Sequence, residues 1–300
     1  MILIFSIIIN YMLPLLFQID NLFEGRVSKR PSKYIKTPYV ADIICSVTNE
    51  EVLGHTASLG CCGLANTNAI ILMAPSPVSK SKPKNQANMK CTHTVYLSVV
   101  KNIAYDDLII GIHPKLAEHL TEAALKNNCL SKLKNIKKYR RETSIYIKDK
   151  VDSRFDFTGV DQDGIPFIME VKNVPLADYE DVTENERGKL DFTNREFNSK
   201  VAYFPDGYRK KSTDPVSPRA LKHIRELTFI KKETSVRCIM CYVIQRTDIN
   251  RFQPSVIDPE YRSAFIDAIK AGVEIITMVV KWTKEGNAYF IRDDLPISSL

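Results

Sequence analysis

One segment constrains the fold more than any other: residues 151–172, VDSRFDFTGVDQDGIPFIMEVK, which predict two strands joined by a tight turn. A three-residue loop, 162–164, with its glycine in the left-handed conformation is a favoured closure for such a hairpin. This closure places Asp156 opposite Glu170, and Arg154 opposite Lys172. Since side chains two apart on a strand share a face, we expect all four on the same face. An even-numbered loop would instead separate the two carboxylates.

Two carboxylates held together repel each other unless a cation joins them. One answer is structural, with Arg154 and Lys172 pairing with the acids across the strands. The other is functional, with Mg²⁺ or Mn²⁺ held by Asp156, Glu170 and the carbonyl of Val171. Such a metal polarises a phosphate, and Lys172 would orient or deprotonate the attacking water, which is the chemistry of phosphodiester hydrolysis.

The region around this hairpin, residues 111–300, alternates helices and strands and therefore predicts an α/β domain. The expected strands are Ser144–Phe157, Ile165–Val171, Val236–Ile244 and Val273–Val280. The expected helices are Lys115–Leu133, one opened by Ser217-Pro218, and one opened by Asp258-Pro259 and closed by Gly272. A charged segment near 178–200 is expected to be an inserted loop.

Residues 13–110 predict a second, smaller domain made of short strands. The expected strands are Tyr39–Val47, Glu51–His55, Ala69–Met73 and Thr92–Val100, and 75–90 is expected to be a loop. Several short strands in so few residues favour a small OB-like β-barrel. Basic residues lie near Tyr34 and Tyr39, namely Arg26, Lys29, Arg30, Lys33 and Lys36. This mixture suits a nucleic-acid groove and equally suits a solvated loop.

The first residues are apolar: residues 1–17 carry no charged side chain before Gln18, but Asn10 and Pro14 interrupt them. A membrane span needs about 20 apolar residues, and a signal peptide needs an initial basic residue. We therefore favour Met12 as the true start, with residues 1–11 as an upstream extension and the first domain beginning after the segment 1–12; a membrane anchor over 1–17 is the alternative. The net charge of +7 permits a polyanionic partner, and 44% hydrophobic content excludes a disordered chain.

The seven cysteines form an odd, scattered set, which indicates reduced thiols and a cytoplasmic or nucleoplasmic protein. Cys238 and Cys241 have the CxxC spacing but lie in an expected strand. Residues three apart on a strand point to opposite faces, so the pair is not expected to bind zinc.

The order Asp156…Glu170-Val171-Lys172 resembles the core of PD-(D/E)XK nucleases. Over about residues 13–282 the chain resembles the sugar fermentation stimulation protein family more specifically. The matching motifs are Arg154-Phe155-Asp156-Phe157, Glu170-Val171-Lys172, Phe204-Pro205-Asp206, Arg219-x-x-Lys222-His223-x-x-Glu226-Leu227, Ile257-Asp258-Pro259-Glu260-Tyr261 and Gly272-Val273-Glu274. The resemblance implies a two-domain protein: an N-terminal OB-like β-barrel followed by a PD-(D/E)XK nuclease-like α/β domain.

The resemblance also adds residues to the expected site. Glu142 is a candidate third metal ligand, or else a partner for neighbouring Lys137, Lys138, Arg140 or Arg141. The first helix after the hairpin carries one polar stripe, formed by Arg219, Lys222, His223 and Glu226. Such a stripe is commonly a solvated face, and the resemblance implies phosphate contacts beside the metal site. The other candidates for binding nucleic acid are Arg154 and, in the barrel, Arg26, Arg30 and Lys33. Asp206 and Gln245 are weaker candidates.

The binding loops depart from the family pattern. The family's His-x-Pro-Asn-Thr-Gly reads His55-Thr56-Ala57-Ser58-Leu59-Gly60 here, and His113-Pro114-Lys115-Leu116 replaces an expected Pro-Asn element before the helix. Taken together, we expect a Mg²⁺- or Mn²⁺-dependent nuclease that hydrolyses phosphodiester bonds of nucleic acid, with DNA favoured and RNA as the alternative substrate, and without a small-molecule cofactor. The alternative is a non-catalytic DNA-binding regulator on a nuclease scaffold.

Overall fold

The computed structural model describes residues 13–57, 63–76, 91–102, 104–205 and 215–299. Expectations that concern residues 1–12, Ser58-Leu59-Gly60, most of the 75–90 loop and Asp206 lie outside these ranges. The chain divides into two compact units. The first contains Gln18–Pro114 and Trp282–Asn287; the second contains the described residues up to Phe17, Lys115–Lys281 and the described residues from Ala288 onward.

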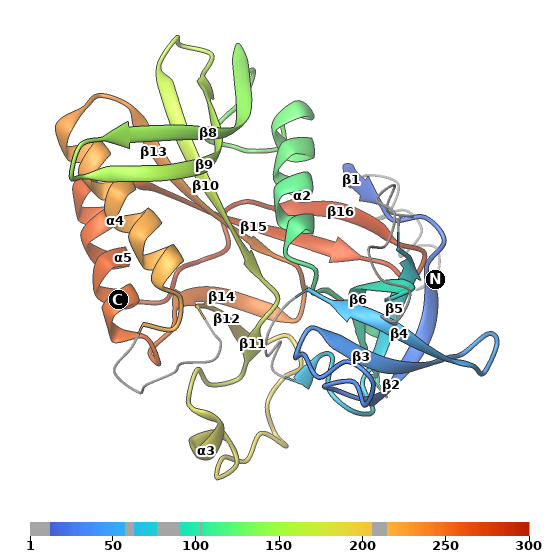
Figure 1. Cartoon of the computed structure of the whole chain (residues 1–300). Helices are drawn as coiled ribbons and strands as arrows, with labels where there is room; N and C mark the ends of the chain where they lie inside the picture. Colours follow the sequence, from blue (N-terminus) through green and yellow to red (C-terminus); the bar gives the residue numbers. More distant parts are fainter. Residues whose placement is uncertain (1–12, 58–62, 77–90, 103, 206–214, 300) are drawn as a thin grey trace, which may run out of the picture. The chain divides into compact units, whose positions relative to one another are not determined.

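The first unit is a β-barrel, drawn in blue to teal in Figure 1. Its strands are β2 (Phe23–Lys29), β3 (Val40–Cys45), β4 (Glu51–Thr56), β5 (Ile70–Pro75), β6 (His93–Val100) and β7 (Leu108–Gly111). They follow the order β4-β3-β2-β5-β6-β7, and a parallel pairing of β4 with β6 closes five of them into a ring. The expected OB-like barrel is therefore confirmed. Closure leaves these five strands without a free edge.

The barrel core is built from side chains that alternate along its strands. Ile43, Ile71, Met73 and Leu97 are fully buried. Strand β2 was not predicted, and Arg26 therefore lies on a strand rather than in a basic loop. It is exposed beside buried Val27, as the two-residue period of a strand requires.

The second unit is built on a seven-stranded sheet in the order β1-β16-β15-β13-β10-β9-β8. These strands are β1 (Leu15–Gln18), β8 (Lys138–Ile147), β9 (Val151–Val160), β10 (Pro166–Val174), β13 (Arg237–Ile244), β15 (Glu274–Trp282) and β16 (Asn287–Arg292). Strands β10, β13 and β15 run parallel, while β8–β9 and β9–β10 are antiparallel. A smaller sheet contains β11 (Ala177–Asp178), β12 (Lys200–Phe204) and β14 (Ile249–Pro254), with the short helix α3 (Glu184–Arg187) in the charged segment.

Three longer helices cover the seven-stranded sheet: α2 (Lys115–Lys126), α4 (Pro218–Glu233) and α5 (Pro259–Ala271). Figure 1 shows α4 and α5 side by side. The apolar side chains of α4 and α5 form one core with β9, β10 and β13, including Phe155, Leu227, Tyr242 and Phe265. None of the helices in the described ranges is long and apolar enough to cross a membrane.

Two predicted elements end or break where a residue adopts the left-handed conformation. The helix from Lys115 stops at Lys126 rather than Leu133, because Asn128 has a φ of 54°. The expected strand Ser144–Phe157 is in fact two strands, since Asp149, with a φ of 59°, turns the chain back. Asparagine and aspartate tolerate this conformation better than most residues.

The predicted cap of α5 is confirmed, and its removal has a defined effect. Asp258 accepts hydrogen bonds from Tyr261 N at 3.0 Å and from Val216 N at 2.8 Å. Asp258→Ala is expected to lower the free energy of unfolding by about 2 kcal/mol, because both donors lose their acceptor. Urea unfolding would measure this, with exposed Asp267→Ala on the same helix as the control. Equal stability of the two variants would contradict the assignment of the cap.

Candidate active site

The predicted register of the hairpin is confirmed. Pro166 pairs with Val160 and Met169 with Phe157, and Gly164 closes the loop with a φ of 87°. The paired register ends at Phe157 and Met169. Beyond this point the Val171 N–H donates to Asp156 Oδ2 at 2.7 Å, so the Asp156 side chain takes the place of a backbone partner.

A buried cluster of charged and polar side chains lies next to Asp156. Glu170 is only 3% exposed, and its Oε1 accepts a hydrogen bond from Lys172 Nζ at 2.6 Å. The same Oε1 contacts His223 Nδ1, which comes from α4 and is also buried. The Lys172 Nζ and His223 Nδ1 atoms are 3.5 Å apart. The structure therefore brings Asp156, Glu170 and Lys172 together and adds His223 to them.

The two carboxyl groups have different electrostatic surroundings. Burial, together with the nearby charge of Glu170, raises the pKa of Asp156 to about 7. Burial also acts to raise the pKa of Glu170, but Lys172 and His223 outweigh it, so the net pKa lies below its ordinary value. Glu170 is thus the more readily ionised member of the pair, whereas for Asp156 the nearby Lys172 does not offset burial and the charge of Glu170.

Arg154 does not complete the expected quartet of side chains. The β9–β10 ladder ends before it could pair with Lys172, and Arg154 instead lies 3.4 Å from Glu142. Both side chains are more than half exposed. Glu142 has a φ of 50°, which interrupts β8 opposite Asp156. Its partner is therefore an arginine on β9 rather than one of the neighbouring basic residues on its own strand.

The expected polar stripe on α4 is divided between surface and interior. Arg219 and Lys222 are exposed, whereas His223 and Glu226 are buried. Lys222 Nζ donates to the carbonyl oxygen of Asp152 at 2.5 Å, and Glu226 Oε1 accepts from Asp152 N at 2.9 Å. Lys222 and Glu226 thus hold α4 against the start of β9.

Sequence reasoning placed His223 among the phosphate contacts, and its burial was missed. A signal for it was present, because His223 is three residues after Ala220 and four before Leu227, both buried. The weaker candidate Gln245 is also buried and donates to Asn173 Oδ1 at 2.5 Å.

The barrel residues expected to bind nucleic acid belong to the first unit and are described there alone. Arg26 and Lys33 are exposed and Arg30 is half-buried. Lys33 Nζ lies 2.6 Å from Glu51 and over the ring of Tyr34, and Arg30 Nε donates to the Pro38 carbonyl at 3.0 Å. Tyr34 is 52% exposed, which leaves an aromatic face open next to a cation.

The two cysteines with CxxC spacing lie on opposite faces of the sheet, as predicted for a strand. Cys238 belongs to the core under α4 and α5, whereas Cys241 Sγ lies 4.0 Å from the Thr121 hydroxyl of α2. Burial raises the pKa of each thiol to about 12.

This burial predicts a pattern of chemical reactivity. Below about pH 11 both thiols stay protonated in the folded state, so iodoacetamide is expected to leave Cys238 and Cys241 unmodified. Half-buried Cys91 and Cys129 are expected to react before these two, although burial raises the pKa of their thiols as well. Peptide mass spectrometry would locate the modification, with denatured protein as the control. Rapid labelling of Cys238 in the folded protein would contradict this burial.

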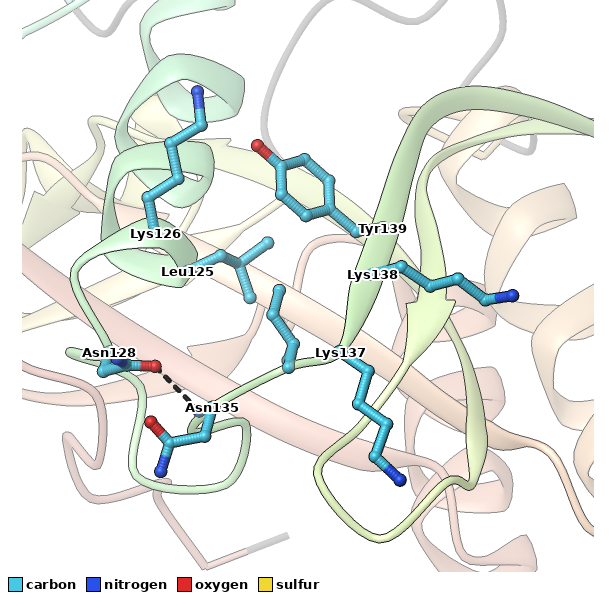
Figure 2. Close-up of a pocket in the computed structure, with 8 residues that line it drawn as sticks. Leu125, Lys126, Asn128, Asn135, Lys137, Lys138 and Tyr139 are labelled. Atoms are coloured by element: carbon cyan, nitrogen blue, oxygen red, sulfur yellow. Dashed lines mark hydrogen bonds between the residues drawn. The ribbon is translucent and has the colours of Figure 1, made fainter.

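A pocket of about 570 Å³ lies elsewhere in the second unit, between the end of α2 and the start of β8 (Figure 2). Its lining residues are Leu125, Lys126, Asn128, Asn135, Ile136, Lys137, Lys138 and Tyr139. The ammonium groups of its lysines point in different directions in Figure 2, so they do not converge on one anion. The pocket shares no residue with the carboxylate cluster, formed by Asp156, Glu170, Lys172 and His223. The carboxylate cluster, rather than the pocket, is the candidate site.

The carboxylate cluster has the properties of a divalent-metal site of low ligand number. Among the described residues, Glu170 Oε2 is buried and has no hydrogen-bond partner. No group of three or more His, Cys, Asp or Glu side chains in the same residues is placed to hold a metal ion. Mg²⁺ commonly uses one or two carboxylates and completes its shell with water and substrate oxygens. The donors present therefore fit such an ion.

A five-stranded barrel followed by an α/β unit with an Asp/Glu/Lys cluster on a hairpin defines a protein with a restriction-endonuclease-like domain. The family described as "Sugar fermentation stimulation protein RE domain" matches residues 115–189 and 190–286. The chain therefore belongs to the sugar fermentation stimulation protein family.

Individual relatives agree with this assignment. The homologue from Maricaulis maris is 28% identical over 257 residues, covering 85% of this chain and 88% of the relative. The homologue from Crocosphaera subtropica is 31% identical over 196 residues, 64% of this chain and 68% of the relative. The solved structure of Pyrococcus furiosus SfsA in complex with Ca²⁺ matches with a TM-score of 0.69 at 17% identity, covering 95% of this chain and 100% of the other.

Proposed function

We propose that this protein is a divalent-metal-dependent nuclease, with DNA favoured over RNA as its substrate. The observation that carries the proposal is the pairing of Glu170, whose buried Oε2 has no partner in the described structure, with Asp156, whose pKa is raised to about 7. A cation shared by the two carboxyl groups would stabilise the ionised form of both and remove the repulsion between them. The Pyrococcus relative was solved with Ca²⁺, which supports a divalent ion for this family.

Asp156, Glu170 and the Val171 carbonyl would hold Mg²⁺ or Mn²⁺. When bound, such an ion polarises a phosphate and lowers the pKa of its water. Lys172 would orient the attacking water or, once its ammonium has lost a proton, accept the proton of that water. Glu142 is exposed and paired with Arg154, so it would act through water rather than as a direct ligand.

Exposed and half-buried cations would position the phosphate backbone, because Lys and Arg contacts supply most of the affinity for nucleic acids. In the second unit these are Arg154, Arg219 and Lys222, and in the barrel they are Arg26, Arg30 and Lys33. No small-molecule cofactor is needed for this chemistry. The five described cysteines are all free, which supports a cytoplasmic or nucleoplasmic location.

One observation favours a second function, that of a non-catalytic DNA-binding regulator. Lys172 already pairs with the Glu170 carboxylate through Oε1, and His223 contacts the same oxygen, without any metal. The same cluster could therefore be kept for structure alone.

One assay separates the two functions. Full-length protein and a Glu170→Ala/Lys172→Ala double variant would be incubated with plasmid, single-stranded DNA and RNA in Mg²⁺, Mn²⁺ or EDTA. Cleavage that needs metal and disappears in the double variant is expected, and the polymer that is cut identifies the substrate. Binding that weakens steeply with salt, without cleavage under any metal, would support the regulator instead. Absence of binding would contradict both functions.

A further inference from the structure

The role of His223 follows from what its ring contacts. Its Nδ1 meets Glu170 Oε1 inside the core, and its ring lies 5.8 Å from that of Phe155. The His223 side chain is 4% exposed, so it is not placed to contact a phosphate on the surface. A buried histidine that contacts a carboxylate oxygen satisfies that oxygen and orients the carboxylate.

The direction of this hydrogen bond is determined by charge. Lys172 Nζ is an ammonium, which can only donate, so Glu170 Oε1 acts as a hydrogen-bond acceptor in this cluster. The His223 Nδ1 must therefore carry a proton and donate it to the hydrogen bond. For the same reason it does not accept from Lys172 Nζ, 3.5 Å away, and both groups donate to the same oxygen.

The contacts of Lys172 and His223 with Oε1 restrict the orientation of the Glu170 carboxylate. Lys172 comes from the same strand as Glu170, whereas His223 comes from α4, which begins at its Ser217 cap and packs on the sheet. With Oε1 held by two partners, rotation of the carboxylate is restricted, and Oε2 is the oxygen of Glu170 that has no hydrogen-bond partner among the described residues.

We infer that His223 is a positioning residue: it holds Glu170 Oε1 so that Oε2 is presented to a divalent cation. This inference rests on the proposed metal-dependent function. It replaces the phosphate contact that the sequence suggested for His223. Outer-shell partners of this kind typically contribute about tenfold or more to metal affinity.

A pair of variants that differ by one methylene tests the inference. The amide nitrogen of asparagine can occupy the place of His Nδ1, whereas the glutamine amide extends past it. His223→Asn is therefore expected to keep Mn²⁺ affinity within about threefold, and His223→Gln and His223→Leu to lose about tenfold. Calorimetric titration of the full-length protein with Mn²⁺ measures these affinities without substrate, and DNA binding in EDTA is expected to be unchanged in all three variants. Thermal unfolding verifies that each variant is folded.

A second readout does not depend on metal. In a long-range ¹H–¹⁵N NMR spectrum of the metal-free protein, Nδ1 of His223 is expected to carry its proton, and the signal is expected to shift in Glu170→Gln. A proton on Nε2 alone would overturn the inference, as would wild-type Mn²⁺ affinity in both His223→Gln and His223→Leu. Weaker DNA binding in EDTA with unchanged metal affinity would overturn it in favour of a phosphate contact.

The failure of the proposed function has a different signature. If the wild-type protein and Glu170→Ala bind Mn²⁺ equally weakly, the metal site itself is wrong, and the inference falls with it. If wild type binds, Glu170→Ala does not, and the His223 variants behave as wild type, only the inference is wrong.

Discussion

Replacing Glu170 with alanine is expected to lower the rate of metal-dependent cleavage by about a thousandfold, since a bound metal contributes several kcal/mol to such reactions. The variant removes the Oε2 atom that has no partner within the described structure. It also removes the neighbouring charge that, after burial, contributes most to raising the pKa of Asp156. The remaining carboxylate would have less need of a cation, so metal affinity is expected to fall together with activity.

The measurement is single-turnover cleavage of the polymer that the wild type cuts, at saturating metal. Asp163→Ala is a matched control, because it removes an exposed carboxylate from the turn of the same hairpin. Its rate is expected to stay within about threefold of wild type, as for most surface substitutions. Comparable losses in the two variants would mean that the hairpin, rather than the Glu170 carboxylate, is being perturbed.

The largest loss of stability is expected when the ion pair between Arg246 and Asp248 is broken. Both are buried, and the arginine donates to both oxygens of the carboxylate, at 2.6 and 2.7 Å. Lys200 Nζ lies 2.6 Å from the same carboxylate. Arg246→Met is expected to lower the free energy of unfolding by about 3 kcal/mol, because Asp248 would remain buried with one partner fewer.

The free energy of unfolding lost in Arg246→Met is expected to become smaller as the pH falls. Burial acts to raise the pKa of Asp248, but Arg246 and Lys200 outweigh it and leave the pKa below its ordinary value. Stability from such a group is present at neutral pH and is lost as the pH falls below about 4. The difference between wild type and variant should therefore shrink between pH 7 and about pH 3.

Urea unfolding at both pH values measures this effect. Arg292→Met serves as the control, since Arg292 pairs with Asp294 on the surface, where both side chains are 45% or more exposed. That pair is expected to contribute less than about 1 kcal/mol. A loss in Arg246→Met no larger than in Arg292→Met would show that the buried pair is not a source of stability.

Local chemistry explains which parts of the structure could be predicted from the sequence. The hairpin register followed from Gly164, because a left-handed glycine in a three-residue loop permits one pairing of the strands. The start of α4 at Ser217-Pro218 followed in the same way from capping. These features depend on a few neighbouring residues, so the sequence carries them directly.

The features that were missed depend on contacts between distant residues. The turn at Asp149 contains no glycine, and nothing nearby shows that the chain reverses there. Arg154 was assigned to Lys172 because the ladder was assumed to continue, yet it stops at Phe157 and Met169. The contact of His223 with Glu170 joins residues 53 positions apart, and a helical pattern alone does not reveal which strand a helix covers.

The short connection between β15 and β16 has a practical consequence for taking this protein apart. Residues Trp282–Asn287 belong to the barrel unit, where Gly286 O accepts from Ile19 N at 2.9 Å and Lys284 lies 2.6 Å from Asp107. The polypeptide thus enters the barrel unit, leaves it at Pro114 and returns to it near the C-terminus. No single cut yields two intact fragments, and a gene truncated after Pro114 would encode a barrel that lacks one of its own segments. Assigning activities to either half therefore calls for point substitutions, or for co-expressed fragments that can reassemble.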